Sequence, residues 1–183
     1  MSGQPKSQFD IGWQPPAPQN QQPPGLESKM DPLPAVDEVP TFDGGATKYV
    51  PAGKLKDRKA LITGGDSGIG RAIAVLYAME GADSYIVYLP EEQEDAEKTQ
   101  KLVEQYGRKC YLHATDLKSQ ENCKKVVEQA LEKLGKINIL VNNAAYQMMQ
   151  DTILDIPEEQ WIHTFDTNIH RKSNITPRPR PVH

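Results

Sequence analysis

The residues best suited to chemistry in this sequence lie in one glycine-rich stretch, TGGDSGIGRA, at positions 63–72. An apolar run precedes Thr63 and another begins at Ile69, so the stretch joins a predicted strand to a predicted helix. Such a junction gathers free backbone N–H groups and the positive end of the helix dipole at one point. The stretch therefore predicts a site for an anion such as a phosphate group.

The glycines of this loop have separable predicted roles. Gly64 permits a tight turn out of the strand. Gly68 lets a diphosphate approach the backbone without a Cβ in the way, and Gly70 allows the helix to pack closely on the sheet. Turns alone can produce a glycine pattern, but this one lies inside a predicted strand–helix–strand unit. That context predicts dinucleotide binding.

Around the loop, short apolar runs alternate with longer amphipathic segments. We expect strands at 59–63, 84–88, 109–114 and 137–142, and helices at 69–80, 91–106, 119–134 and 157–167. Strict alternation implies parallel strands joined by right-handed crossovers. The predicted fold class is α/β, a Rossmann-type doubly wound parallel sheet, incomplete at about four strands, with an extended N-terminal arm.

The chain divides into three compositional zones. Residues 1–50 are rich in proline and glutamine and are expected to form an extended arm. That arm is either a floppy tail or a segment lying along the domain or a neighbouring subunit, with Phe9, Trp13, Leu26 and Met30 as anchors. Residues 51–169 are the predicted dinucleotide-binding region. Residues 170–183 are basic and carry three spaced prolines, so an unstructured tail is expected there.

The choice between NAD and NADP stays open at this stage. An acidic residue about twenty positions after the glycines commonly holds the adenosine ribose 2′-OH. Here the second strand runs out through Tyr88, Leu89 and Pro90, and the first acids are Glu91 and Glu92. Both are also explained as helix-start acids. The strand end has no arginine to receive a 2′-phosphate.

Four motifs in order resemble those of the short-chain dehydrogenase/reductase family. The pattern TGxxxGIG is matched at 63–70, TDL at 115–117 is similar to the family's motif after the third strand, NNAA at 142–145 resembles its NNAG, and DTNI at 166–169 resembles its helix with a catalytic Asn. The arm sequence ESKMDPLP and the stretch YLPEEQEDA are similar to a subgroup related to glucose and ribitol dehydrogenases.

The resemblance implies a role for each matched residue. Asp116 would contact the adenine amino group, Asn142 and Asn143 would brace the sheet beside the cofactor, and Asn168 would hold the water of a proton relay. Ala145 replaces the family's usual glycine. The cofactor-binding residues implied are Thr63, Gly64, Ser67, Gly68, Ile69, Gly70, Asp116, Leu117, Asn143 and Ala144.

Family membership would make the protein an NAD(P)-dependent oxidoreductase that acts on a small alcohol or carbonyl substrate, in a family that is usually homotetrameric. That chemistry needs a serine and a Tyr-x-x-x-Lys pair, and no tyrosine in the 183 residues has a lysine four positions later. We therefore expect the cofactor-binding half of such an enzyme, followed by an out-of-frame or alternatively spliced tail, and no dehydrogenase turnover by this chain alone. The alternatives are a non-catalytic dinucleotide-binding or subunit-interaction fragment, and an inactive fragment.

Composition argues against several other classes of function. The net charge is −4 and the acidic and basic residues are interspersed. The sequence therefore lacks the basic stripe that nucleic-acid binding requires, and nucleic acid is not expected as a partner. The sequence has no apolar h-region at its start and no run of membrane-spanning length, which favours a cytoplasmic protein without a membrane partner. The cysteines and histidines show no metal-site spacing, so no metal is expected.

Overall fold

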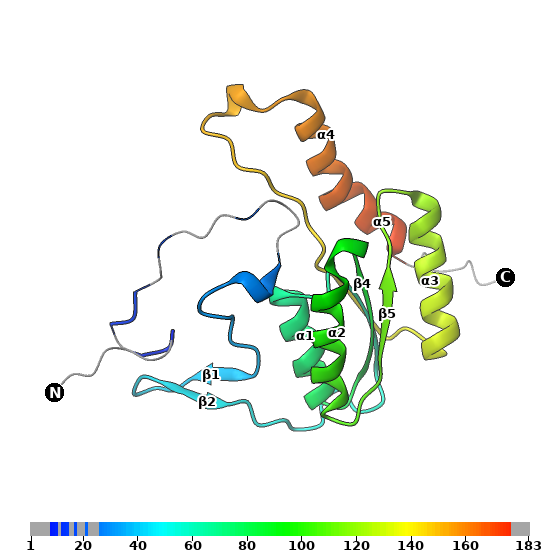
Figure 1. Cartoon of the computed structure of the whole chain (residues 1–183). Helices are drawn as coiled ribbons and strands as arrows, with labels where there is room; N and C mark the ends of the chain where they lie inside the picture. The colour runs from blue at the N-terminus through cyan, green and yellow to red at the C-terminus, as the bar shows by residue number, and fades with distance from the viewer. Residues whose placement is uncertain (1–7, 11, 15–16, 18–20, 22–25, 177–183) are drawn as a thin grey trace.

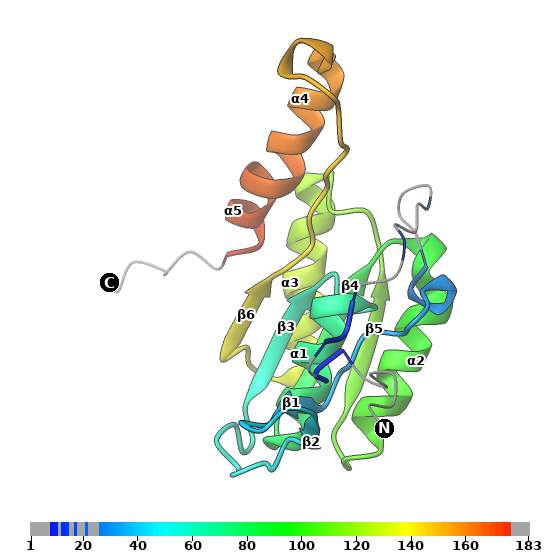
Figure 2. The ribbon, with the colours of Figure 1, turned by 90° about the vertical axis from the view of Figure 1, so that its left-hand side faces the viewer.

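The computed structural model describes residues 8–10, 12–14, 17, 21 and 26–176. Its centre is a parallel sheet in the order β5-β4-β3-β6. These strands are β3 (Lys59–Thr63), β4 (Asp83–Tyr88), β5 (Cys110–Ala114) and β6 (Ile139–Asn142). The order is visible in Figure 2. Because β3 and β4 are central and carry long apolar runs, their side chains are buried on both faces.

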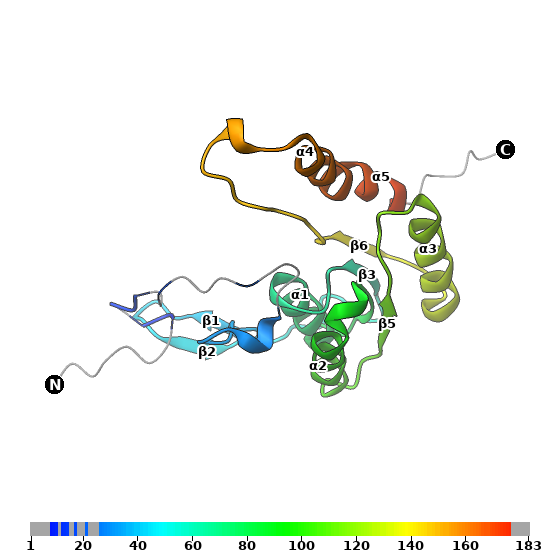
Figure 3. The ribbon, with the colours of Figure 1, turned by 45° about the horizontal axis from the view of Figure 1, so that its top comes forward.

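Helices cover both faces of this sheet (Figures 1 and 3). Helices α1 (Gly68–Met79) and α2 (Gln93–Glu104) cover one face, and α3 (Gln120–Leu134) covers the other. Alternate residues of β3 point to opposite faces, so Ile62 packs with α1 while Leu61 packs with α3. The result is the predicted doubly wound α/β arrangement.

The expected elements are all present, with ends that differ by a few residues. Ser119 caps α3 by accepting a hydrogen bond from the Asn122 amide, and Gly135 follows its end with a positive φ. The helix expected at 91–106 begins instead with a 3₁₀ turn, η2 (Pro90–Glu92). The last expected helix is α4 (Glu158–Phe165), which a 3₁₀ turn η3 (Ile153–Asp155) precedes.

The expectation of an unstructured tail from residue 170 is wrong for residues 170–176. Helix α4 continues through a π-helical turn, η4 (Asp166–His170), into α5 (Arg171–Ile175). The Ile175 side chain is 1% exposed and packs with Cys123 and Val126 of α3. Burial of this apolar side chain stabilises α5. The basic, proline-containing sequence does not indicate that contact. Residues 177–183 lie outside the described part of the chain.

The described part of the arm lies on the α1 and α2 side of the sheet (Figure 1). It contains the 3₁₀ turn η1 (Glu27–Lys29) and a hairpin of β1 (Glu38–Pro40) with β2 (Ala46–Lys48), which the sequence did not predict. Of the four expected anchors, Phe9, Trp13 and Leu26 are half-buried, whereas Met30 is exposed. Among the described residues of the arm, Glu27 is the one that is buried, so polar contacts as well as apolar ones hold this segment.

No helix within residues 26–176, where all the described helices lie, has the length and apolar character needed to cross a membrane.

Candidate functional site

The carboxyl ends of the sheet strands open into a cavity of about 560 Å³. In a doubly wound sheet this edge, where the strand order reverses beside β3, is where ligands bind. The cavity is within the size range of ligand pockets. Of the residues expected to bind a cofactor, it is lined by Gly64, Asp116, Leu117 and Ala144, and Ala145 lies beside them. A second cavity, of about 610 Å³, lies between the arm and α1 and α2 and contains none of those residues.

The glycine loop leads from β3 into α1 along one edge of this region. Gly64 has a φ of +62°, and a Cβ there would lie 3.1 Å from the Ala144 Cα. At Gly70 a Cβ would lie 1.7 Å from the Gly64 carbonyl oxygen, so only glycine fits. At Gly68, by contrast, a Cβ would meet nothing within 4 Å. The loop is therefore tightly packed at Gly64 and Gly70 and open at Gly68.

The backbone amides at the start of α1 are unequally used. The Gly68 amide donates to the Glu27 carboxylate. For the Ile69 and Gly70 amides, no acceptor lies among the residues that the structure describes. These two amides are therefore available to an anionic ligand at the positive end of the helix dipole.

Thr63 and Asn143 hold the ends of β3 and β6 together. The Thr63 hydroxyl accepts hydrogen bonds from the Asn143 and Ala144 amides, each at 3.1 Å. The Asn143 side chain donates to the Gly64 carbonyl at 2.8 Å. The resemblance implied bracing by Asn142 and Asn143. Asn143 makes these contacts together with Thr63, whereas the Asn142 Oδ1 is buried with no hydrogen-bond partner among the described residues.

Asp116 lies where β5 gives way to the loop before α3. Its Oδ1 accepts a hydrogen bond from the Lys118 amide at 2.8 Å, while its Oδ2 is 3.8 Å from the Lys118 Nζ. The carboxylate lines the cavity and is about half exposed. One oxygen is therefore held by the backbone, and the other can accept a hydrogen bond from a ligand.

Both polar groups of the Asn168 side chain form hydrogen bonds with the backbone of Tyr146. The Asn168 Oδ1 accepts from the Tyr146 amide and the Asn168 Nδ2 donates to the Tyr146 carbonyl, both at 2.9 Å. Asn168 lies in the π-helical turn η4, a local irregularity common at functional sites. The side chain thus fixes the segment after β6 against this turn.

The cavity also contains residues that sequence reasoning did not assign. Tyr146 and His163 both line it, and their rings stack with centroids 3.8 Å apart. Thr167 and Arg171 lie on the same helical segment and complete that wall. The only sequence signal for them is their closeness to the NNAA and DTNI motifs.

Glu91 and Glu92 also line the cavity, at the position where a ribose-binding acid was sought. Glu92 closes the first turn of η2 by accepting a hydrogen bond from the Leu89 amide at 3.0 Å, as expected of a helix-start acid. Burial, with a smaller contribution from Asp66, raises the pKa of Glu92 to about 7. The hydrogen bond confirms the helix-start interpretation for Glu92, whereas ribose binding by either acid stays a prediction.

The raised pKa of Glu92 predicts a pH-dependent stability. Because the folded state favours the protonated carboxyl, this contribution is complete below pH 4.5 and is lost as the pH rises through about 7. We expect Glu92→Gln, which keeps a hydrogen-bond acceptor, to lose less stability than the wild type between pH 5 and about 8. Urea unfolding of both proteins at several pH values gives the difference between their free energies of unfolding. Burial lowers the pKa values of His113 and His163, which contribute in the opposite direction, but these contributions are common to both proteins and cancel in the difference. Parallel pH profiles would contradict the prediction.

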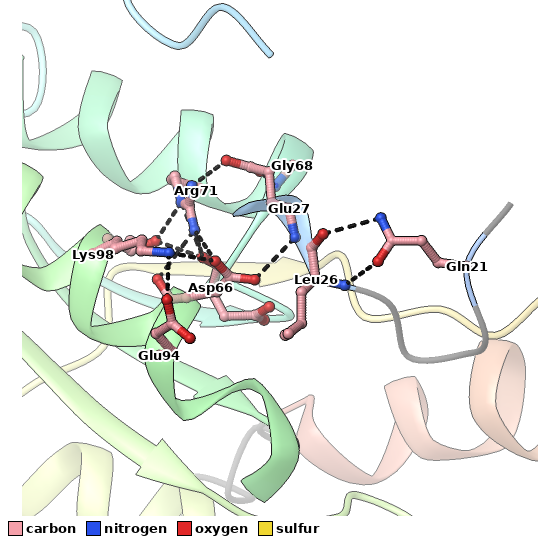
Figure 4. A network of polar contacts seen from close by, with 10 residues as sticks. Gln21, Leu26, Glu27, Asp66, Gly68, Arg71, Glu94 and Lys98 are labelled. Carbon is pink, nitrogen blue, oxygen red and sulfur yellow. Dashed lines mark hydrogen bonds and ion pairs between the residues drawn. The ribbon is translucent and has the colours of Figure 1, made fainter. Parts of the chain in front are cut away.

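Beside the loop, a second set of polar groups surrounds the buried Arg71 side chain (Figure 4). Its Nε and Nη2 donate to the Asp66 carbonyl at 3.0 and 2.8 Å. Nε also donates to the Thr99 hydroxyl, Nη2 donates to Asp95, and Nη1 contacts Glu27. The guanidinium thus joins the loop, α1, α2 and the arm.

Comparisons with known proteins agree with this architecture. A family model described as short chain dehydrogenase matches residues 58–176, beyond residue 170, where the resemblance was expected to end. An uncharacterized oxidoreductase of Schizosaccharomyces pombe is 47% identical over 84% of this chain and 52% of its own length. The glucose and ribitol dehydrogenase of Daucus carota is 40% identical over 85% of this chain and 52% of its own length. The chain spans about half the length of the curated relatives it matches.

Two solved structures are similar over the same region. A short chain dehydrogenase from Mycobacterium paratuberculosis bound to NAD is 33% identical, with a TM-score of 0.62, over 67% of this chain and 49% of its own. A short chain dehydrogenase from Burkholderia cenocepacia in complex with NADP is 30% identical, with a TM-score of 0.63, over 67% and 49%.

Proposed function

Because the chain belongs to the short-chain dehydrogenase family, we propose that it supplies the dinucleotide-binding part of an NAD(P)-dependent oxidoreductase. Such an enzyme transfers a hydride between the nicotinamide ring and an alcohol or carbonyl substrate. One observation carries the proposal: the glycine loop contributes Gly64 to the wall of a cavity of about 560 Å³ at the carboxyl edge of the sheet. The same loop leads into the start of α1, where the amides of Ile69 and Gly70 have no acceptor among the described residues. The NAD-bound and NADP-bound similar structures support the cofactor class and leave the choice between the two open.

Different residues bind different parts of the proposed cofactor. The diphosphate lies against the amides of Ile69 and Gly70, where the helix dipole stabilises negative charge. Asp116 accepts a hydrogen bond from the adenine amino group. Thr63 and Asn143 contribute without touching the cofactor, because their hydrogen bonds to each other and to the Gly64 carbonyl hold the loop in place. Ser67, Gly68 and Leu117 complete the expected binding surface.

In this proposal, Asn168 has a positioning role. Its side chain fixes the backbone of Tyr146, which lines the same cavity as Asp116. The proton-relay role implied by the family resemblance is part of the proposal for the whole enzyme. Glucose and ribitol dehydrogenase, the similar carrot protein, supports small alcohols as the substrate class.

Dinucleotide binding can be measured directly on the 183-residue chain. We expect NADH at about a hundred times its dissociation constant to raise the free energy of unfolding by about 2.7 kcal/mol. Asp116→Ala is expected to weaken NADH binding by about 1.5–3 kcal/mol, the value of a hydrogen bond to a charged group. Urea unfolding with and without NADH measures the first effect, and titration followed by NADH fluorescence measures the second. Asp43→Ala, which removes an exposed acid on the hairpin side, is the control. A wild-type chain that melts cooperatively but neither binds nor is stabilised by NADH or NADPH would rule the proposal out.

The family's oligomeric assembly is a further part of the proposal. Helix α4 presents three large exposed apolar side chains, Trp161, Ile162 and Phe165, which support contact with another subunit. Sedimentation velocity of the purified chain tests this part, since a monomer at all concentrations would contradict it.

A further inference from the structure

The arm contributes a charged side chain to the start of α1. Glu27 is 6% exposed, although acids of this kind are rarely buried without a partner. Its backbone amide donates to the Asp95 Oδ2 at 3.0 Å, which fixes the η1 turn against α2. Its carboxylate then reaches both the Gly68 amide and the Arg71 guanidinium, as Figure 4 shows.

These two contacts fix both sides of the glycine loop. Gly68 is the first residue of α1, so the contact with its amide fixes where the helix begins. Arg71, held by Glu27, donates two hydrogen bonds to the Asp66 carbonyl inside the loop. The Thr99 hydroxyl donates to the same carbonyl at 2.7 Å. Glu27 therefore limits the positions that the loop backbone can take.

We propose that Glu27 is a positioning residue of the dinucleotide site: the arm holds the diphosphate-binding loop in its binding conformation through the Gly68 amide and Arg71. This inference rests on the proposed function. It assigns the arm a part in cofactor affinity, because a loop already held in its bound conformation loses less entropy when the ligand binds.

The geometry favours positioning over competition between the Glu27 carboxylate and the diphosphate. Glu27 uses the first amide of α1 and leaves those of Ile69 and Gly70 available. Its charge faces the Arg71 guanidinium, so the negative charge is neutralised within the network. The two models predict opposite signs. Removal of a positioning residue weakens NADH binding, whereas removal of a competitor strengthens it.

The test compares NADH affinity in the full chain and in Glu27 variants. We expect Glu27→Ala to raise the NADH dissociation constant about tenfold or more, since two charge-assisted contacts are lost. Glu27→Gln keeps one acceptor oxygen without the charge and is expected to give an intermediate loss. ADP, which carries a diphosphate, should lose affinity with NADH, whereas adenosine should be unaffected.

Controls separate this effect from a general loss of stability. Glu38→Ala removes an exposed acid of the same arm and should leave NADH binding unchanged. If Glu27→Ala does not fold, Glu27→Gln decides the question at the same ligand concentrations. Unchanged or tighter NADH binding by the folded variants would overturn the inference, as would an equal loss of affinity for adenosine. If the wild type binds no dinucleotide, the proposed function fails as well, whereas normal binding by the variants removes this inference alone.

Discussion

Replacing Arg71 with methionine is expected to lower the free energy of unfolding by about 3–5 kcal/mol, the cost of breaking a buried ion pair by removing one partner. The Arg71 side chain is 7% exposed, and its guanidinium contacts the carboxylates of Glu27 and Asp95, whose side chains are at most 5% exposed. Methionine fills similar space but leaves both acids without this partner. It also removes two of the hydrogen bonds that the Asp66 carbonyl accepts.

Thermal and urea unfolding of the full chain measure the effect. A loss of this size corresponds to a fall of roughly 10 °C in Tm for a chain of this length. Arg58→Met is the matched control, because Arg58 is exposed and its substitution is expected to change stability by less than about 0.5 kcal/mol. Equal stability of the Arg71 and Arg58 variants would mean that the buried network contributes little to folding.

Replacing Gly70 with alanine is expected to cost at least about 3 kcal/mol, at the upper end for overpacking a buried site. Helix propensity alone predicts the opposite sign, a gain of about 1 kcal/mol from a Gly-to-Ala change. The clash decides the sign, because the new Cβ would lie 1.7 Å from the Gly64 carbonyl oxygen and 2.8 Å from the Asn143 Nδ2. The methyl group would enter the Asn143–Gly64 hydrogen bond and move α1 away from the loop.

Gly68→Ala provides the matched comparison two residues away. Its Cβ meets nothing within 4 Å, so only its φ of +50° opposes the substitution, at about 1–2 kcal/mol. Urea unfolding ranks the two variants, and NADH titration reports whether the loop still binds. A Gly70→Ala protein as stable as the wild type would show that α1 can move from the loop without cost.

Local patterns account for most of the elements that the sequence predicted. The sequence predicted the strands and helices because apolar periodicity acts within a few residues, and local caps such as Ser119 and Gly135, which the structure shows, agree with it. Pro90 illustrates the limit of this reasoning. Proline suits the first turn of a helix, and Pro90 does begin a turn, but the turn is 3₁₀ and the α-helix begins only at Gln93. The unexpected helix α5 has no strong local signal, since it depends on burial of Ile175 against α3.

In the candidate site, too, some features follow from local sequence and others depend on the tertiary structure. Because the motifs are local, the sequence by itself determined the position of the glycine loop after β3 and of Asp116 after β5, and the resemblance implied the bracing contacts that Asn143 makes. Only the tertiary structure placed Glu27 on the Gly68 amide, 41 residues away, and Asn168 on Tyr146, 22 residues away. It also raised the pKa of Glu92, which depends on burial and on the nearby Asp66. Pairings between distant residues and the burial of charge arise from packing of the whole chain, and no local pattern encodes them.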